Sequence, residues 1–284
     1  MGILDSVTSA VPKEGIRAVI AGVEGIGKTT FACGAPRPLL VPLEDGLPSG
    51  LIVNKTPKLD KFPYVTQLLD EIIASITAGQ FQYQSIVIDS ATALERLIHN
   101  TTLATDPLYI DGNKKGLIMD NALGGYGKAY NYANSLFEGF LGRCDYLSRV
   151  LGINIILTCH VFASKQKDPT AGEYDQWDLL MHSPKNEKNH GKREMITQWA
   201  DLVGFMYEPI FVVEGEGNKM SKAVSQNKGR ILACNRTPSF VAKNRYKIAS
   251  EIAVPVEQGW NHLAKAIYDG CKHDVFNRDV VVAQ

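Results

Sequence analysis

The sequence predicts an α/β protein in which a mostly parallel sheet is covered by helices on both faces. Two observations support this prediction. Short apolar runs alternate with segments in which apolar residues recur at helical spacing, and a glycine-rich motif, G-V-E-G-I-G-K-T, directly follows the first apolar run. Alternating strands and helices are typical of a parallel sheet, because each helix returns the chain to the start of the next strand. With 284 residues, the chain is long enough for one large domain.

The predicted strands are short apolar runs, several of which stop at glycine or acidic residues. They lie at residues 17–21, 38–43, 85–88, 153–158, 202–213 and 228–233. Helices are predicted where apolar residues recur every three or four positions. This pattern covers residues 65–76 and 133–147, and shorter helices are predicted at 28–32, directly after the glycine-rich motif, and at 92–98 and 260–268.

Two long polar segments, residues 99–127 and 161–193, interrupt this alternation. Neither shows apolar periodicity, so we predict two long loops. Loops of this length are uncommon in a compact domain and usually carry function. The chain is therefore expected to consist of an N-terminal tail, one α/β domain and a C-terminal tail, at residues 1–14, 15–269 and 270–284.

Composition narrows the class of protein. The 30 basic and 30 acidic residues cancel, which argues against a protein that coats nucleic acid over its whole surface but leaves room for a local basic groove. The five cysteines form no C-x-x-C pair, as expected for reduced thiols. No apolar run approaches the roughly 20 residues of a membrane span, and the N-terminus lacks a signal-peptide pattern. We expect a cytoplasmic protein that does not contact membranes.

The glycine-rich motif has the spacing G-x-x-x-x-G-K-[ST] of a phosphate-binding P-loop, and it lies between a predicted strand and a predicted helix. Backbone N–H groups of such a loop surround the β-phosphate, the lysine reaches the β- and γ-phosphates, and the hydroxyl binds magnesium. The sequence therefore predicts ATP and Mg²⁺ as ligands. The predicted nucleotide-binding residues are Gly22, Val23, Glu24, Gly25, Ile26, Gly27, Lys28, Thr29 and Thr30.

Polar residues at the ends of other predicted strands complete the candidate site. Asp89 ends the strand at 85–88, where a carboxylate would hold magnesium opposite Thr29. Glu44 follows the second strand and is expected to orient the attacking water or accept its proton, with Asp45 as the second candidate. His160 follows the strand at 153–158 and is expected to sense the γ-phosphate.

These motifs, together with L-E-D-G at 43–46, S-I-V-I-D-S at 85–90 and L-T-C-H at 157–160, resemble in their order the RecA-type ATPase core. The resemblance implies that residues 15–269 form a RecA-like P-loop NTPase domain. It assigns Glu44 to catalysis and His160 to the sensor position, where RecA has glutamine. In that family two mobile loops line the path of single-stranded DNA, and the two polar segments fall in their places.

A narrower resemblance rests on G-Y-G-K-A-Y at 125–130 and V-A-K-N-R-Y at 241–246. These runs, with the histidine sensor, are similar to phage-encoded RecA-like single-strand annealing proteins of the Sak-four type. The K-N-R run also resembles motifs that act across subunit interfaces. The resemblance implies that Lys243 and Arg245 reach the nucleotide of a neighbouring copy, in a filament or ring with nucleotide at each interface. It also implies a phage protein in the cytoplasm of a bacterial host.

Lysines and aromatic residues in the two polar segments are compatible with single-stranded DNA, because cations contact phosphates and aromatic rings stack on bases. Candidates include Lys114, Lys115 and Tyr126 in the first segment, with Lys128 and Tyr130 directly after it, and Lys165, Lys167, Lys192, Arg193 and Trp177 in the second. The leading hypothesis is an ATP-dependent recombination protein that promotes annealing or strand pairing.

Three other function classes stay open. One is a ring-forming helicase-type motor or loader, and another is a nucleotide switch without catalysis. The third is a small-molecule P-loop kinase, which the K-N-R run does not favour. Kinases also usually carry an arginine-rich lid, and residues 99–127 contain no arginine.

Overall fold

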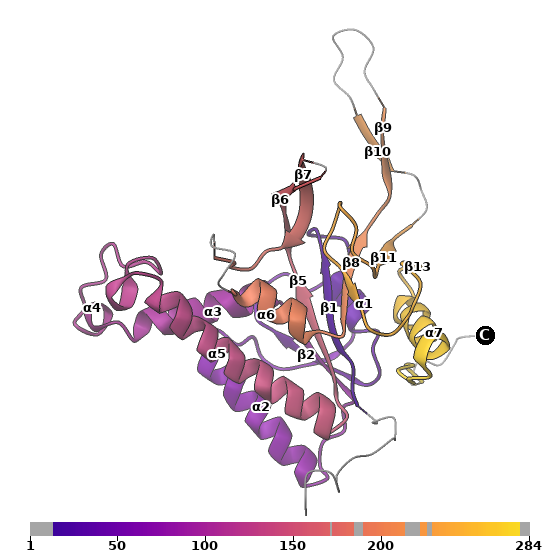
Figure 1. Cartoon of the computed structure of the whole chain (residues 1–284). Helices are drawn as coiled ribbons and strands as arrows, with labels where there is room; N and C mark the ends of the chain where they lie inside the picture. Colours follow the sequence, from indigo (N-terminus) through magenta and orange to yellow (C-terminus); the bar gives the residue numbers. More distant parts are fainter. Residues whose placement is uncertain (1–13, 171, 185–189, 214–221, 226–228, 279–284) are drawn as a thin grey trace, which may run out of the picture.

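A computed structural model describes residues 14–278, apart from residues 171, 185–189, 214–221 and 226–228 (Figure 1). Its strands are β1 (Arg17–Gly22), β2 (Pro38–Pro42), β3 (Asn54–Lys55), β4 (Ser85–Asp89), β5 (Asn154–Cys159), β6 (Val161–Asp168), β7 (Gly172–Leu179), β8 (Leu202–Tyr207), β9 (Ile210–Val213), β10 (Lys222–Ser225), β11 (Ile231–Ala233), β12 (Lys243–Asn244) and β13 (Glu251–Ala253). Its helical elements are α1 (Lys28–Ala32), α2 (Phe62–Thr77), α3 (Ala91–Ala104), α4 (Pro107–Ile110), η2 (Ala122–Gly124), α5 (Lys128–Asp145), the π-helical η3 (Tyr146–Val150), α6 (Lys192–Trp199) and α7 (Gly259–Cys271).

The main sheet has the strand order β13-β11-β8-β1-β5-β4-β2-β3, and β12 pairs with β8 beside this path. Every pair from β8 to β3 is parallel, whereas β11, β12 and β13 join antiparallel at the other side. This mostly parallel sheet with helices on both faces confirms the predicted α/β P-loop NTPase fold.

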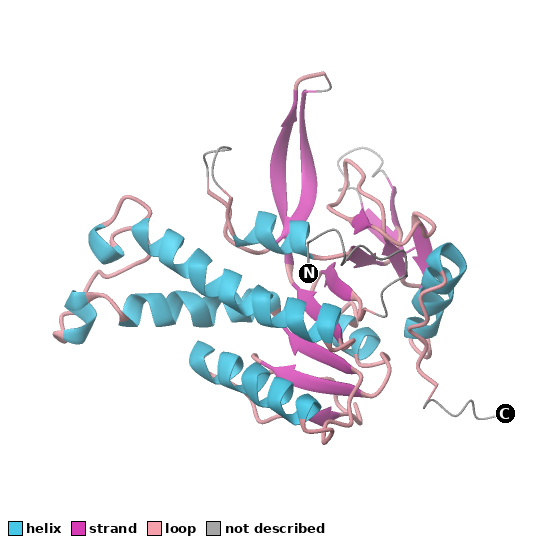
Figure 2. Cartoon of the chain, turned by 60° about the horizontal axis from the view of Figure 1, so that its bottom comes forward, coloured by secondary structure: helices cyan, strands magenta, loops and turns pink. Residues whose placement is uncertain are grey.

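Alternating side chains of β1 divide the interior into two cores. Val19 and Ala21 pack into one core with α2, α3 and α5, and Ala18 and Ile20 pack into the other with α1 and α7. In the cartoons, α2, α3 and α5 lie together on one side of the sheet, and α7 lies beside β13 (Figures 1 and 2). Because both faces of β1 are buried, its end and the loop that follows are rigidly placed.

The first polar segment is not one long loop. Helix α3 continues to Ala104, where the prediction ended at residue 98, and α4 and η2 follow. Within α3, Thr101 and Thr102 donate their hydroxyls to carbonyls one turn back, at 2.9 Å in both bonds, so polar residues continue the helix. Asp106 caps α4 by accepting the Leu108 N–H at 2.8 Å.

The prediction of a loop is also wrong for much of the second polar segment. Residues 161–168 and 172–179 form the antiparallel hairpin β6–β7, and α6 begins at Lys192, near the end of the segment. The hairpin extends away from the main sheet (Figure 1). On its exposed face Lys165 is paired with Asp175 and Lys167 with Glu173 across the two strands. Opposite charges in such pairs stabilise a strand pair without any apolar alternation. Polar composition therefore concealed a regular element.

The last described residues pack against the domain. Helix α7 runs to Cys271, so the boundary predicted at residue 269 lies inside it. Trp260 donates its indole N–H to the Val275 carbonyl at 2.8 Å, and the Asn277 amide donates to the Gly34 carbonyl at 2.9 Å. Residues 1–13 of the predicted N-terminal tail lie outside the described residues. In the described ranges, no helix has the length and apolar character that crossing a bilayer requires.

Candidate nucleotide-binding site

The candidate site is a cavity of about 510 Å³ at the edge of the sheet where the parallel strands β1, β2, β4 and β5 end. Parallel pairing places the carboxyl ends of these strands side by side, with Pro42 opposite Asp89. The cavity is lined by Glu24, Gly25, Gly27, Lys28, Thr29, Thr30, Glu44, Asp45, Gly46, Pro48, Asp89 and His160. The sheet thus brings together residues that are far apart in the sequence.

The P-loop requires glycine at Gly25 and Gly27 for their backbone conformation and at Gly22 for close packing. Gly25 and Gly27 have φ values of +75° and +94°, which side chains with a Cβ rarely adopt. Gly22 lies against β8, where a Cβ would be 2.5 Å from the Met206 carbonyl oxygen. The loop backbone can therefore curl around a phosphate while staying close to the neighbouring strand.

Lys28 is buried at the start of α1 and is held by the loop itself. Its Nζ donates to the carbonyls of Gly22 and Val23, at 2.9 Å in both bonds. An ammonium group has three N–H donors, so one stays available for a phosphate oxygen. Burial lowers the pKa of Lys28, while the nearby carboxylates of Asp89 and Glu44 act in the opposite direction. The lysine is thus placed before any nucleotide binds.

Thr29 and Asp89 form the oxygen pair that a Mg²⁺ ion would need. Thr29 Oγ1 donates to Asp89 Oδ2 at 2.9 Å, and the buried Thr158 hydroxyl donates to the other carboxylate oxygen. Magnesium prefers such hard oxygen ligands and usually keeps waters and phosphate oxygens as its other ligands. In the described part of the chain no group of three acidic, histidine or cysteine residues forms a metal cage. The residues present fit a Mg²⁺ ion that arrives with phosphate.

Glu44 lies in the cavity with both carboxylate oxygens engaged. Oε1 is 2.9 Å from His160 Nε2, and Oε2 accepts from Arg96 at 3.1 Å. The hydrogen bond with His160 is the main cause that lowers the pKa of Glu44, and Arg96 adds to it. A carboxylate with a lowered pKa is a weak proton acceptor. This environment favours a role in orienting water over a role in taking its proton. Asp45 instead pairs with Lys58 and is largely exposed.

His160 connects the cavity to the β6–β7 hairpin. Its ring contacts Glu44, its backbone N–H donates to Thr92 of α3 at 3.2 Å, and its carbonyl accepts from Leu180 N–H at 2.8 Å. Strand β6 begins at the next residue, Val161. Nδ1 is buried and has no hydrogen-bond partner in the described residues. A single hydrogen bond, between Glu44 and His160, therefore connects the cavity to the residue that precedes the hairpin.

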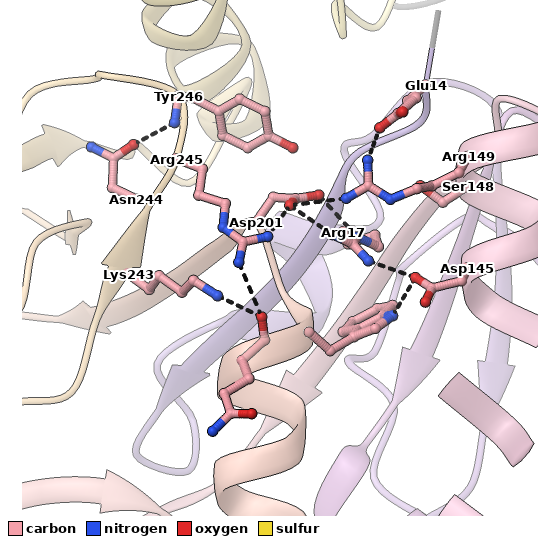
Figure 3. Close-up of polar contacts among 12 residues, drawn as sticks. Glu14, Arg17, Asp145, Ser148, Arg149, Asp201, Lys243, Asn244, Arg245 and Tyr246 are labelled. Carbon is pink, nitrogen blue, oxygen red and sulfur yellow. Dashed lines mark hydrogen bonds and ion pairs between the residues drawn. The ribbon is translucent and has the colours of Figure 1, made fainter. Parts of the chain in front are cut away.

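The structure does not bring Lys243 and Arg245 to the chain's own P-loop. They lie near Asp201 and Arg17, at the starts of β8 and β1 (Figure 3), whereas the P-loop follows the end of β1. Lys243 Nζ donates to the Thr197 and Gln198 carbonyls at 2.8 and 2.7 Å, and Arg245 Nη1 donates to Asp201 Oδ1 at 3.0 Å. Their predicted action on a neighbouring copy stays a prediction.

The two polar segments meet in a buried cluster beside α3. The Tyr130 ring stacks on His182 with centroids 3.9 Å apart. Lys192 is fully buried, with Nζ 3.1 Å from His99 Nε2 and 3.7 Å from Glu95 Oε1. The prediction that Lys192 faces DNA is wrong, because its side chain neutralises a buried carboxylate in place of facing solvent.

This cluster predicts a measurable pH dependence of stability. Burial, together with Lys192 and His182, lowers the pKa of His99 to about 3, from 6.5 in the unfolded chain. Below pH 6.5 the unfolded chain therefore binds more protons, and stability falls as the pH falls. Between pH 7 and 5.5 we expect His99 to remove about 1 kcal/mol from the free energy of unfolding. Urea denaturation at both pH values should show a smaller difference for His99→Gln, and an equal difference in both proteins would contradict the prediction.

Two residues near the site could not be found from the sequence. Thr158 lies within a buried apolar strand and looks like an ordinary strand residue, yet its hydroxyl holds Asp89. Arg230 contacts the P-loop through a hydrogen bond of 3.1 Å to the Ile26 carbonyl, across 204 positions of sequence. No local pattern marks either residue, since each role follows from strand packing.

Comparison with known proteins gives one family match. A family model described as an AAA domain matches residues 14–246, which is well over half of the chain. The matched span runs from just before β1 to just after β12 and contains every site residue described above. No curated protein shows a significant match to the chain.

Proposed function

We propose a DNA-dependent role for this chain, which belongs to the AAA domain family of P-loop ATPases. Membership implies nucleotide binding, typically with Mg²⁺. The proposed function is more specific: an ATP-dependent protein that binds single-stranded DNA and promotes annealing or strand pairing in recombination. The proposal adds DNA binding and recombination to the general ATPase activity of the family.

The chain's own residues can perform the parts of phosphoryl transfer that a protein supplies. The P-loop backbone and Lys28 would hold the phosphates, and Thr29 and Asp89 would hold the metal ion. The ionised Glu44 would orient a water at the γ-phosphate, kept in place by its bonds to His160 and Arg96. Bound Mg²⁺ would neutralise phosphate charge. Positioning and charge stabilisation account for most of catalysis in this reaction class.

One observation carries the proposal of DNA coupling: His160 bonds to Glu44 and continues directly into the β6–β7 hairpin. A γ-phosphate that moves Glu44 would also move His160, and the Leu180–His160 bond would transmit this to both strands of the hairpin. The hairpin carries exposed Trp177 and the lysines of β6. Stacking and phosphate contacts from such residues hold single strands without sequence preference.

The first polar segment adds a second set of exposed groups. Tyr126 is 99% exposed, and Lys114 Nζ lies 4.0 Å from the centre of the Tyr109 ring. In the hairpin, by contrast, Lys165 and Lys167 face acidic residues across the strands. We therefore propose weak, salt-sensitive binding by one chain, strengthened when copies assemble along a strand.

Assembly would involve the residues of the K-N-R run. Arg245 keeps 50% of its side chain exposed while it bonds to Asp201, and Lys243 bonds only to backbone carbonyls in the described residues. We propose that both side chains exchange these internal bonds for the nucleotide of a neighbouring copy in a homo-oligomeric filament or ring. Such trans-acting cations stabilise the charge that develops on the γ-phosphate.

ATP turnover tests the proposal directly. We expect hydrolysis to rise several-fold with single-stranded DNA, to rise little with duplex DNA, and to lose the stimulation as salt is raised. Turnover should be measured at two salt concentrations with no DNA, single strands and duplex, using the full chain. Hydrolysis rates that do not respond to DNA would overturn the proposed role. The chain would then be a P-loop ATPase that acts on another phosphate acceptor or with another partner.

A further inference from the structure

Arg230, just before β11, rests against the backbone of the P-loop. Its Nη1 donates to the Ile26 carbonyl at 3.1 Å. The same atom is 2.1 Å from the place that a Cβ on Gly27 would occupy, so the arginine can approach only because residue 27 is glycine. In the described residues, no other arginine donates a hydrogen bond to this loop.

Among the residues that the structure describes, no carboxylate pairs with the Arg230 guanidinium. Its Nε and Nη2 are buried and have no hydrogen-bond partner, and no ion pair to it occurs in the described ranges. Burial alone lowers its pKa, with no contribution from a carboxylate. Arg17 shows the usual arrangement, since it pairs with both Asp145 and Asp201. A partly buried cation whose inner donors lack partners weakens a fold, so its presence beside a phosphate loop calls for an explanation in function.

We propose that Arg230 is a positioning residue of the nucleotide site, and that the β-phosphate of the bound nucleotide supplies its missing counter-charge. The inference rests on the proposed nucleotide-binding function and names a residue that the P-loop motif does not include. In a planar trans peptide the C=O and N–H groups point in opposite directions. By holding the Ile26 carbonyl, Arg230 directs the Gly27 N–H of the same peptide to the other side, into the loop.

The contact between Arg230 and the loop also has an electrostatic consequence. A positive charge beside Gly27 lies behind the backbone groups that surround the β-phosphate in a loop of this type. It is partly removed from water, so it interacts more strongly with an anion than an exposed arginine would. ATP and ADP both carry a β-phosphate, so the two should depend on Arg230 equally. The residue therefore acts on binding, whereas Glu44 acts on hydrolysis.

Arg230→Met separates this role from a purely structural one, because methionine keeps much of the apolar stem but removes the charge and the donors. We expect the affinity for both ATP and ADP to fall about ten-fold or more. The thermal midpoint without nucleotide should stay the same or rise, because an unpaired buried charge is lost. Arg230→Lys should recover part of the affinity, since its ammonium can donate to the same carbonyl. The exposed Arg236→Met serves as the matched control and should behave like the wild type.

The experiment compares the full-length wild type with these variants by titration with Mg-ATP and Mg-ADP and by thermal unfolding without nucleotide. Weaker binding of both nucleotides with an unchanged or higher midpoint supports the inference. Unchanged affinities in Arg230→Met would overturn it, and so would a lowered midpoint, which would make Arg230 an ordinary structural contact. If the wild type binds neither nucleotide, the proposed function itself is wrong. If the wild type binds and Arg230→Met binds equally well, only the role of Arg230 is wrong.

Discussion

Replacing Lys28 with alanine is expected to abolish ATP turnover and to weaken nucleotide binding by at least about a hundred-fold. The buried ammonium is fixed by the Gly22 and Val23 carbonyls and keeps one donor for a phosphate oxygen. Alanine removes that donor and leaves both loop carbonyls without their partner, so the loop also loses its shape. Binding is measured by titration with Mg-ATP, and turnover by phosphate release.

Lys265→Ala is a suitable control for this variant. Lys265 lies on α7 with 70% of its side chain exposed and pairs only with Asp269 in the described residues. Its loss should change neither binding nor turnover, because exposed ion pairs contribute little. Turnover that survives in Lys28→Ala would mean that the nucleotide binds elsewhere, or that the measured activity comes from a contaminant.

Glu44→Gln is expected to keep ATP binding within a few-fold of the wild type and to slow hydrolysis by about 10²–10⁴-fold. The amide has nearly the same shape, and its carbonyl oxygen can still accept the His160 N–H bond, so the pocket stays intact. It lacks the negative charge that would orient and polarise the attacking water. Single-turnover hydrolysis with saturating ATP separates this effect from binding.

Asp45→Asn tests whether Glu44 or Asp45 orients the attacking water. Asp45 faces solvent and pairs with Lys58, while Glu44 is held inside the cavity by His160 and Arg96. We therefore expect Asp45→Asn to hydrolyse ATP at nearly the wild-type rate. Normal hydrolysis in Glu44→Gln, or a large loss in Asp45→Asn, would show that the assignment to Glu44 is wrong.

The parts of the fold that follow from local patterns could be predicted from the sequence. The strands β1, β2, β4 and β5 are continuous apolar runs because they are buried on both faces, and the P-loop has a fixed spacing. Their parallel order then places Glu44, Asp89 and His160 at one edge of the sheet, so the proximity of these three residues to the P-loop could be predicted before the geometry was known.

The other features depend on contacts that a sequence does not display. The β6–β7 hairpin places Lys165 opposite Asp175 and Lys167 opposite Glu173 on its exposed face, so this face shows no apolar alternation. Lys192 looks like a solvated loop lysine, yet it is buried beside Glu95. Arg230 reaches Gly27 only through the antiparallel pairing of β11 with β8. For Lys192 and Arg230, the decisive partner is far away in the chain.

The central claim, that the γ-phosphate controls DNA binding through Glu44, His160 and the hairpin, is tested most directly by the affinity of Glu44→Gln for a single-stranded oligonucleotide. This variant should hold ATP without hydrolysing it, so the ATP and ADP states can be compared in one protein. The dissociation constant is measured by fluorescence anisotropy at fixed salt. We predict binding at least about ten-fold tighter with Mg-ATP than with Mg-ADP. Equal affinity in the two states, or no binding in either, would contradict the account.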